Sequence, residues 1–412
     1  MQNDNTKRVL KSIYFFGSIQ VLQVIFSIVK IKLVSVLVGP SGLGDFTLFN
    51  NFLITIVFIL GLGLYNGAVR YIAIENELGR VHEVKKIFSI VNIITLITSV
   101  LAGVILFYFA ENVSQYLFNS PNRVLEVRIL ASILFIAALG NRNTMVLQGL
   151  GMYRQLGYTA VLSSAFTAVA VTVIYYYLRN EGVSFAIVAS SFVTYIVGFL
   201  FIRKINFKVN NFAISPDLFV KGRELVGLSL IVMFGSLFGN LITNIINVYL
   251  LKNGSAEQLG FYNAALTISV QYVGLVFYSI SMEFYPRLAS INNDDEKMHS
   301  MINEQARVVL LILFPILFFM QIFAPFLVSI LFTNEFNVIV SFIQISTIAV
   351  VFQALAYIIS NVPLAKADKT VTLIFNSVIP GLVSLISSIL GYHMMGLKGM
   401  ALGLILVNIF HF

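Results

Sequence analysis

The sequence predicts an all-α integral membrane protein with twelve transmembrane helices in two six-helix lobes. Three observations lead to this prediction: 58% of the 412 residues are hydrophobic, only 11% are charged, and long apolar runs recur along the whole chain. A soluble protein carries about 25% charged residues, because its surface must be solvated. The composition therefore indicates a chain that lies in lipid.

Twelve apolar runs follow one another along the chain, and a helix needs roughly 20 apolar residues to cross the bilayer. They cover residues 12–38, 46–74, 87–110, 125–150, 157–178 and 183–202, and then 225–251, 260–284, 306–332, 338–362, 370–391 and 397–412. The last run is brief, so we expect this helix to be short or truncated. The first run follows Lys7, Arg8 and Lys11 and precedes no small-residue cleavage site, which predicts a retained helix rather than a signal peptide.

The positive charges between the runs predict that both termini are cytoplasmic. With the N-terminus inside, 17 Lys and Arg residues fall in cytoplasmic segments or at the run ends beside them, 5 fall on the opposite side, and 4 lie further inside the runs. Lys and Arg collect on the cytoplasmic side of membrane proteins, so the net charge of +8 reflects orientation rather than nucleic-acid binding. The external segments are too short to hold a catalytic domain.

A polar stretch in the middle of the chain divides the runs six and six. We expect an N-terminal lobe at 1–205, a cytoplasmic linker at 206–224 and a C-terminal lobe at 225–412. Three weak matches between the halves recur at an offset of 216 or 217 residues, one of them pairing Leu43-Gly44 with Leu259-Gly260. Because each half has an even number of spans, the repeats predict pseudo-two-fold symmetry about an axis along the membrane normal. Transporters with this symmetry bind substrate between their halves and alternate access by rocking.

Several kinds of chemistry are excluded by absent residues. The chain has no Cys, which removes disulfides and thiolate chemistry, and its four His residues are scattered. No Gly-Lys-Ser or Gly-Lys-Thr triplet occurs, so there is no P-loop ATPase. We expect no enzyme activity, no cofactor and no metal site.

Short motifs then point to a family. Gly39-Pro40-Ser41-Gly42-Leu43-Gly44 and the glycine-rich stretch 61–67, followed by Arg70-Tyr71, resemble the first helical pair of translocases for O-antigen or enterobacterial common antigen units. Gly260-Phe261-Tyr262 and Leu364-Ala365-Lys366-Ala367 extend the likeness into the second half. The chain thus resembles the Wzx-type polysaccharide flippases of the multidrug/oligosaccharidyl-lipid/polysaccharide exporter superfamily.

This resemblance implies a substrate and a location. The substrate would be undecaprenyl-diphosphate carrying an oligosaccharide, such as an O-antigen or related surface polysaccharide repeat unit. The protein would move it from the cytoplasmic to the periplasmic leaflet of the bacterial inner membrane, in lipopolysaccharide biosynthesis. Membrane lipid and the polysaccharide polymerase machinery are the further expected partners.

Basic side chains within the apolar runs are the candidate diphosphate ligands. Charged groups inside a span are costly, at about 2.5–3.5 kcal/mol on insertion scales, so each is a functional hypothesis. Arg142 is the first candidate, and Arg70 and Lys32 follow it. The structural alternative for Arg142 is pairing with helix-end carbonyls, and for Arg70 it is snorkelling to the interface. Lys30 lies about 200° around the helix from Lys32, and we expect it to snorkel or face another helix.

Amide side chains are the candidate sugar ligands. Asn240, Asn244 and Asn247 recur at spacings of three and four on one face of the seventh run, and Gln148 follows Arg142 on the fourth. Such a stripe suits sugar hydroxyls, but polar groups also join helices to one another.

Two questions stay open at this point. Asp45 and Glu283, both near helix ends, are the candidates for ion coupling. A multidrug or cation exporter of the same superfamily is the alternative function, although it calls for acids deep in the lumen. A membrane polymerase or ligase is disfavoured by the short external segments.

Overall fold

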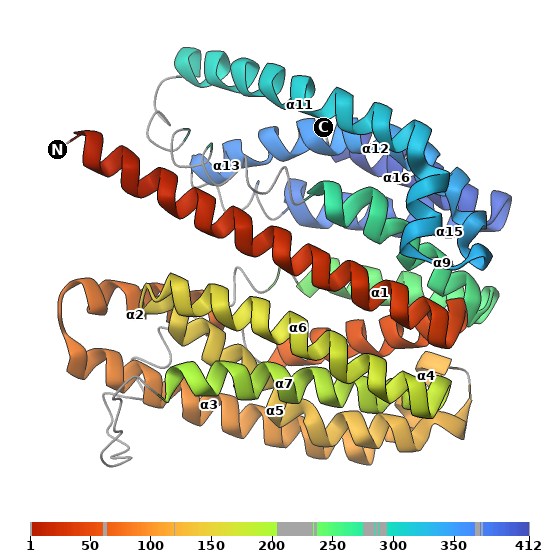
Figure 1. The fold of residues 1–412 in the computed structure, drawn as a ribbon, viewed down its shortest axis with the longest axis horizontal. Coiled ribbons are helices and arrows are strands. Elements are labelled where there is room, and N and C mark those ends of the chain that lie inside the picture. The colour runs from red at the N-terminus through yellow and green to blue at the C-terminus, as the bar shows by residue number, and fades with distance from the viewer. Residues whose placement is uncertain are drawn as a thin grey trace. The chain divides into compact units, whose positions relative to one another are not determined.

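The protein was analysed as a computed structural model, and every secondary-structure element among the described residues is helical (Figure 1). The structure describes residues 2–60, 64–118, 120–203, 234, 237–274, 284, 288, 295–366, 371 and 374–411. The all-α prediction is confirmed for these residues. The expected linker at 206–224 lies outside them.

The chain forms two compact units. The first comprises Met1–Val38 and Phe49–Phe234, and the second comprises Gly39–Leu48 and Gly235–Phe412. A ten-residue segment from the first half of the sequence, Gly39–Leu48, thus packs with the second unit.

Helix α1 (Gln2–Leu60) consists of two helices joined at one residue. Gly39 has φ 64° and ψ −167°, outside the helical region, and Pro40 follows at once. Positive φ suits glycine, and proline suits the first position of a helix because its fixed φ is helical and its missing N–H needs no partner there. Instead of the loop expected between the first two runs, the chain therefore has a sharp kink at Gly39.

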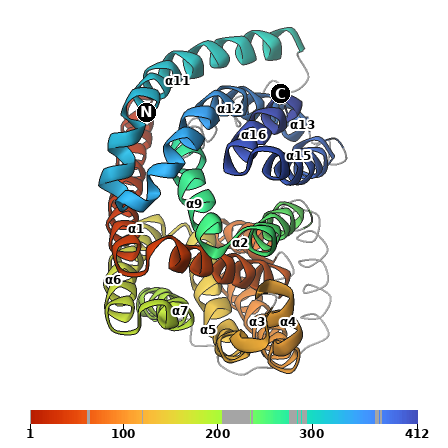
Figure 2. The same ribbon diagram turned by 90° about the vertical axis from the view of Figure 1, so that its right-hand side faces the viewer.

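Four helices form most of the first unit. Helix α5 (Val124–Gly149) packs against α3 (Val81–Tyr108) and α7 (Val183–Ile202), and α6 (Tyr153–Leu178) packs against α7. These helices also run side by side in Figure 2. The shorter elements are α2 (Leu64–Glu77), α4 (Ala110–Phe118) and the 3-10 turns η1 (Pro121–Arg123) and η2 (Arg179–Gly182).

The second unit is also helical. Helix α11 (Asp295–Leu331) packs against α12 (Val340–Ile359), and α16 (Leu397–His411) packs against α12 and α15 (Ile379–Met395). Residues 237–253 are helical and precede α9 (Ala256–Leu266). The short elements are the π-helix η3 (Thr267–Tyr272), the 3-10 helix η4 (Asn334–Ile339), α13 (Asn361–Ala365) and the π-helix η5 (Ile374–Val378).

Within the described residues, seven stretches are long and apolar enough to cross a membrane. One of them, Val21–Ile59, includes the kink at Gly39, and another, Tyr153–Ile202, contains both α6 and α7. Helix α16 is shorter and apolar. The chain therefore has the helices of a multi-pass membrane protein, as expected.

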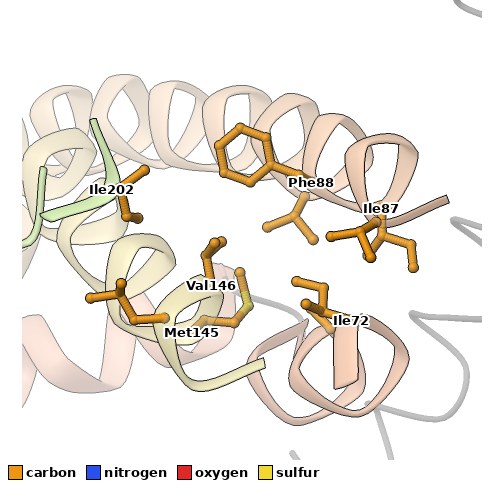
Figure 3. Packing of buried hydrophobic residues seen from close by; sticks show 10 residues of the cluster. Ile72, Ile87, Phe88, Met145, Val146 and Ile202 are labelled. Atoms are coloured by element: carbon orange, nitrogen blue, oxygen red, sulfur yellow. The ribbon is translucent and has the colours of Figure 1, made fainter. Parts of the chain in front are cut away.

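A hydrophobic cluster holds α2, α3, α5 and α7 together (Figure 3). Ile72 of α2, Phe88 of α3 and Val146 of α5 are 7% exposed or less. The approach of α2 to α5 is close, because a Cβ added at Gly149 would lie 2.8 Å from Cβ of Ile72. This core fixes one end of the first unit.

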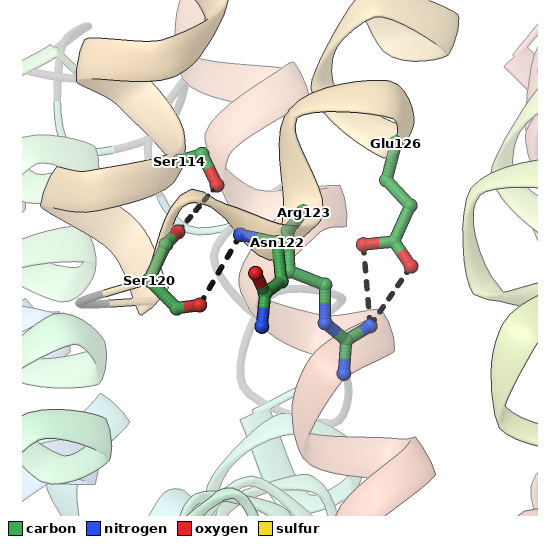
Figure 4. A network of polar contacts seen from close by, with 5 residues as sticks. All are labelled: Ser114, Ser120, Asn122, Arg123 and Glu126. Atoms are coloured by element: carbon green, nitrogen blue, oxygen red, sulfur yellow. Dashed lines mark hydrogen bonds and ion pairs between the residues drawn. The ribbon is translucent and has the colours of Figure 1, made fainter.

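Polar contacts hold the connection between α4 and α5 (Figure 4). The hydroxyl of Ser114 donates to the carbonyl of Ser120 at 2.7 Å, and the Ser120 hydroxyl accepts from the amide of Asn122 at 3.2 Å. Arg123 forms an ion pair with Glu126 at 3.0 Å. These contacts hold the connection in place where α5 begins.

Candidate functional site

A polar cavity of about 190 Å³ lies inside the first unit. It is lined by one aromatic ring, one lysine and five hydroxyl side chains: Phe26, Ser27, Lys30, Ser163, Ser164, Thr167 and Thr194. The lining is positively charged, because it includes Lys30 and no carboxylate.

The lining residues come from three helices at similar depth. Lys30 on α1 precedes the kink at Gly39 by nine residues, or about 13 Å of helix rise. Ser163 lies about 15 Å from the start of α6, and Thr194 lies about 16 Å from the start of α7. Because the hydrocarbon core is about 30 Å thick, the cavity lies near the middle of these spans.

The hydroxyls of the cavity differ in what they already contact. Ser164 donates to the carbonyl of Ala160 at 2.9 Å, and Thr194 donates to the carbonyl of Ser190 at 2.9 Å, so both keep free lone pairs as acceptors. The hydroxyl of Ser163 is buried and has no hydrogen-bond partner among the described residues. A buried polar group of this kind calls for a partner.

Arg142 on α5 lies in a network of its own. Its Nε and Nη2 atoms donate to Oδ1 of Asn143 at 3.2 and 2.6 Å, and Nη1 donates to Oδ1 of Asn92 on α3. The guanidinium carbon lies 5.5 Å from the ring centre of Phe88, a cation–π distance. The guanidinium therefore joins α3 to α5. Its partners are side-chain amides, whereas the alternative considered from the sequence was pairing with helix-end carbonyls.

Helix α7 connects this network to the cavity. Asn143 is fully buried, and its Nδ2 donates to the carbonyl of Tyr195 at 3.3 Å. The neighbouring residue Thr194 lines the cavity. The Arg142 network therefore ends at the residue next to Thr194 on α7.

Lys32 and Gln148, which were predicted for the diphosphate and for the sugar, are not among the residues that line the cavity. Lys32 is half-buried on α1 and does not line the cavity, whereas Lys30 does. Arg70 lies on α2, but its side chain is outside the described part of the structure. Gln148 is half-buried near the end of α5. Their roles stay predictions.

The predicted amide stripe lies in the second unit. Asn240 and Asn244 are half-buried, and Nδ2 of Asn244 donates to the carbonyl of Asn240 at 2.9 Å. Asn247 is fully buried, and its Oδ1 accepts from Nδ2 of Asn263 on α9 at 3.5 Å. At Asn247 the polar side chain therefore joins two helices.

Of the two acids considered for ion coupling, the structure describes one. Asp45 is buried beside Gly44 in the segment that packs with the second unit, and Glu283 lies outside the described residues. In the described part of the chain, no three His, Asp or Glu side chains are grouped so as to hold a metal ion.

Sequence reasoning did not select the cavity residues. The spacing of these residues does indicate shared helix faces. Ser27 and Lys30 are three residues apart, and Thr167 follows Ser163 and Ser164 by four and three residues. Scattered hydroxyls in an apolar helix are common, and only the packing of α1, α6 and α7 brings these sets together.

Comparison with solved structures shows that the fold is similar to that of MATE transporters. An inward-facing multidrug resistance MATE transporter aligns with a TM-score of 0.79 at 16% identity, over 94% of this chain and 92% of that one. An outward-facing MATE transporter aligns at 0.66 with 18% identity, covering 95% and 90%. A superfamily transporter from Pyrococcus furiosus, described as having a binding pocket of reverse polarity, aligns at 0.68 with 16% identity, covering 95% and 90%.

The family follows from sequence. The profile of the family described as polysaccharide biosynthesis protein matches residues 33–341, about three quarters of the chain, and the chain belongs to this family. A similar curated protein is the lipopolysaccharide biosynthesis protein WzxC of Escherichia coli (strain K12), 26% identical over 174 residues. That match covers 42% of this chain and about a third (35%) of WzxC. The resemblance inferred from the motifs is confirmed at the level of the family.

Proposed function

We propose that this protein is a flippase that moves an undecaprenyl-diphosphate-linked oligosaccharide from the cytoplasmic to the periplasmic leaflet of a bacterial inner membrane. The observation that carries the proposal is a lysine in a hydroxyl-lined cavity inside the helices of a polysaccharide biosynthesis protein. The similarity to WzxC supports the same reading. Lipid rejects the head group of such a substrate, so the protein must supply hydroxyls for the sugars and cations for the diphosphate.

The mechanism we propose is alternating access between two lobes. Twelve helices would form two six-helix lobes with both termini cytoplasmic, joined by the linker at 206–224 and related by a pseudo-two-fold axis along the membrane normal. Rocking of the lobes would carry the head group across, while the polyprenyl tail stays in lipid. The MATE-like fold supports this scheme because its solved relatives are described in both inward- and outward-facing conformations.

The proposed ligands divide by chemistry. Arg142, Arg70 and Lys32 would attract the diphosphate, and Asn240, Asn244 and Gln148 would contact sugar hydroxyls. Arg142 would have the further role of joining α3 to α5, which its hydrogen bond to Asn92 and its contact with the Phe88 ring support. Ion coupling through Asp45 stays the weakest part of the proposal.

A multidrug exporter is the alternative, and the MATE-like fold favours it. The charge of the cavity opposes it, because a cationic drug would meet Lys30 and no carboxylate among the lining residues. The two functions predict transport of oppositely charged substrates.

Leaflet transfer in proteoliposomes tests the proposal. Labelled undecaprenyl-diphosphate oligosaccharide is placed in one leaflet, and its accessibility to an external glycan-cleaving enzyme is followed with and without an ion gradient. We expect transfer by the wild-type protein and slower transfer by Arg142→Ala. Efflux of a cationic dye without transfer of the lipid-linked oligosaccharide would overturn the flippase assignment in favour of the exporter.

A further inference from the structure

We propose that the cavity around Lys30 is an oxyanion-binding site of the first unit, which holds one anionic group of the transported head. The proposal rests on the flippase function and adds the residues and the chemistry of one subsite. The oxyanion would be either a phosphate of the carrier diphosphate or the carboxylate of an acidic sugar. Both present oxygen atoms to an ammonium group and to hydroxyls.

Charge is the first argument. Lys30 lies about 13 Å from the kink that ends its helix, in the middle of the span rather than at its edge. Basic residues at such depth face protein interiors or water-filled cavities and mark the paths of ions and substrates. Lys30 is the one charged residue among those that line this cavity, so the lining carries a positive charge.

The hydroxyls are the second argument, and they are independent of the charge. Ser163 is 8% exposed, and its hydroxyl is buried without a hydrogen-bond partner among the described residues. A bound oxyanion accepts hydrogen bonds only, so it would take the proton that Ser163 has to offer. The hydroxyls of Ser164 and Thr194 donate to carbonyls of their own helices, so their oxygen atoms can still accept hydrogen bonds. Hydroxyl groups beside a sugar phosphate or carboxylate could donate to them.

The size of the cavity narrows the choice of occupant. Drug-sized ligands occupy pockets of roughly 300–1,000 Å³, whereas this cavity holds about 190 Å³. A phosphate group or one sugar residue fits such a space, and a whole repeat unit does not. The cavity is therefore a subsite for the charged part of the head.

Arg142 and Lys32 do not provide the same site. The guanidinium of Arg142 is bonded to Asn92 and Asn143 and does not line the cavity. Lys32 lies on the same helix as Lys30 but outside the lining.

The test measures binding of soluble probes to the purified full chain in detergent, separately from transport. The probes are inorganic pyrophosphate and methyl glucuronide, with methyl glucoside as the uncharged control. We expect Lys30→Met to weaken oxyanion binding by about tenfold to a hundredfold, since charge-assisted hydrogen bonds are lost. Lys30→Arg should retain most of the affinity, and Ser163→Ala should lose about threefold to tenfold.

The arms distinguish the two sources of the oxyanion. Binding of pyrophosphate that depends on Lys30 assigns the site to the carrier diphosphate, and binding of methyl glucuronide assigns it to an acidic sugar. Failure of wild type to bind either probe, or equal binding by a folded Lys30→Met variant, overturns the site. If leaflet transfer does not depend on Lys30, the flippase function is supported and the subsite is overturned. If the probes bind but no leaflet transfer occurs, the binding site is supported and the flippase function is overturned.

Discussion

Gly44 and Gly260 pack against each other reciprocally in the second unit. A Cβ added at Gly44 would meet the carbonyl oxygen of Ala256 and lie 3.0 Å from the amide nitrogen of Gly260. A Cβ added at Gly260 would meet the carbonyl oxygen of Pro40 and lie 3.2 Å from the amide nitrogen of Gly44. Two helices therefore cross here with backbone against backbone.

The partners in this crossing stand at one constant offset. Ala256 follows Pro40 by 216 residues, and Gly260 follows Gly44 by the same number, which is the offset of the weak repeat. Reciprocal contact between equivalent residues is the property of an interface on a two-fold axis. The crossing is therefore a contact that the proposed duplication accounts for.

The first prediction concerns this crossing. Gly44→Ala and Gly260→Ala should each destabilise the protein by about 1–3 kcal/mol, because the added methyl group meets backbone that cannot rotate away. The measurement is the midpoint of thermal unfolding in detergent. Gly239→Ala is the control, since a Cβ there meets nothing within 4 Å and alanine favours helix. An unchanged midpoint for Gly44→Ala would show that the two helices do not cross this closely.

The second prediction concerns the Arg142 network. Asn92→Ala removes one partner of a half-buried guanidinium and should lower the free energy of unfolding by about 1.5–3 kcal/mol. Arg142→Lys should be destabilising as well, because an ammonium group does not reproduce the planar fork that reaches Asn92 and Asn143 together. Asn92→Ala combined with Arg142→Ala should cost less than the sum of the two single changes, which a double-mutant cycle measures. Additive losses would mean that the two side chains are not coupled.

The sequence predicted the helices better than the site. The predicted runs 125–150 and 183–202 correspond closely to α5 and α7, because the bilayer sets how long an apolar helix must be. The kink at Gly39 was expected as a loop, since sequence shows where a helix is weak and not how sharply the chain turns. The sequence analysis ranked Lys32 above Lys30, whereas Lys30 lines the cavity, because only neighbouring helices decide which face of α1 does so.

The third prediction concerns the connection drawn in Figure 4. Ser120→Ala should lower the free energy of unfolding by about 1 kcal/mol, because the hydroxyl caps the amide of Asn122. Glu126→Gln should cost less, since Arg123 and Glu126 are 30% and 19% exposed and surface ion pairs contribute about 0–1 kcal/mol. Thermal unfolding at low and at high salt checks both values. Salt should reduce only the effect of Glu126→Gln, and an equal response of both variants would contradict the assignment.

The last prediction separates the three asparagines of the polar stripe. Asn247 is fully buried, its Nδ2 has no hydrogen-bond partner among the described residues, and its contact with Asn263 is long. Asn247→Val should therefore leave stability within about 1 kcal/mol of wild type, because an unsatisfied buried amide is replaced by an apolar group of comparable size. Asn240 and Asn244 are half-buried, so their substitution by Val should slow leaflet transfer instead. Parallel measurement of unfolding and transfer for the three variants decides the matter: loss of transfer in a stable Asn247→Val protein would place the Asn247 amide in the substrate path, in a conformation that exposes it.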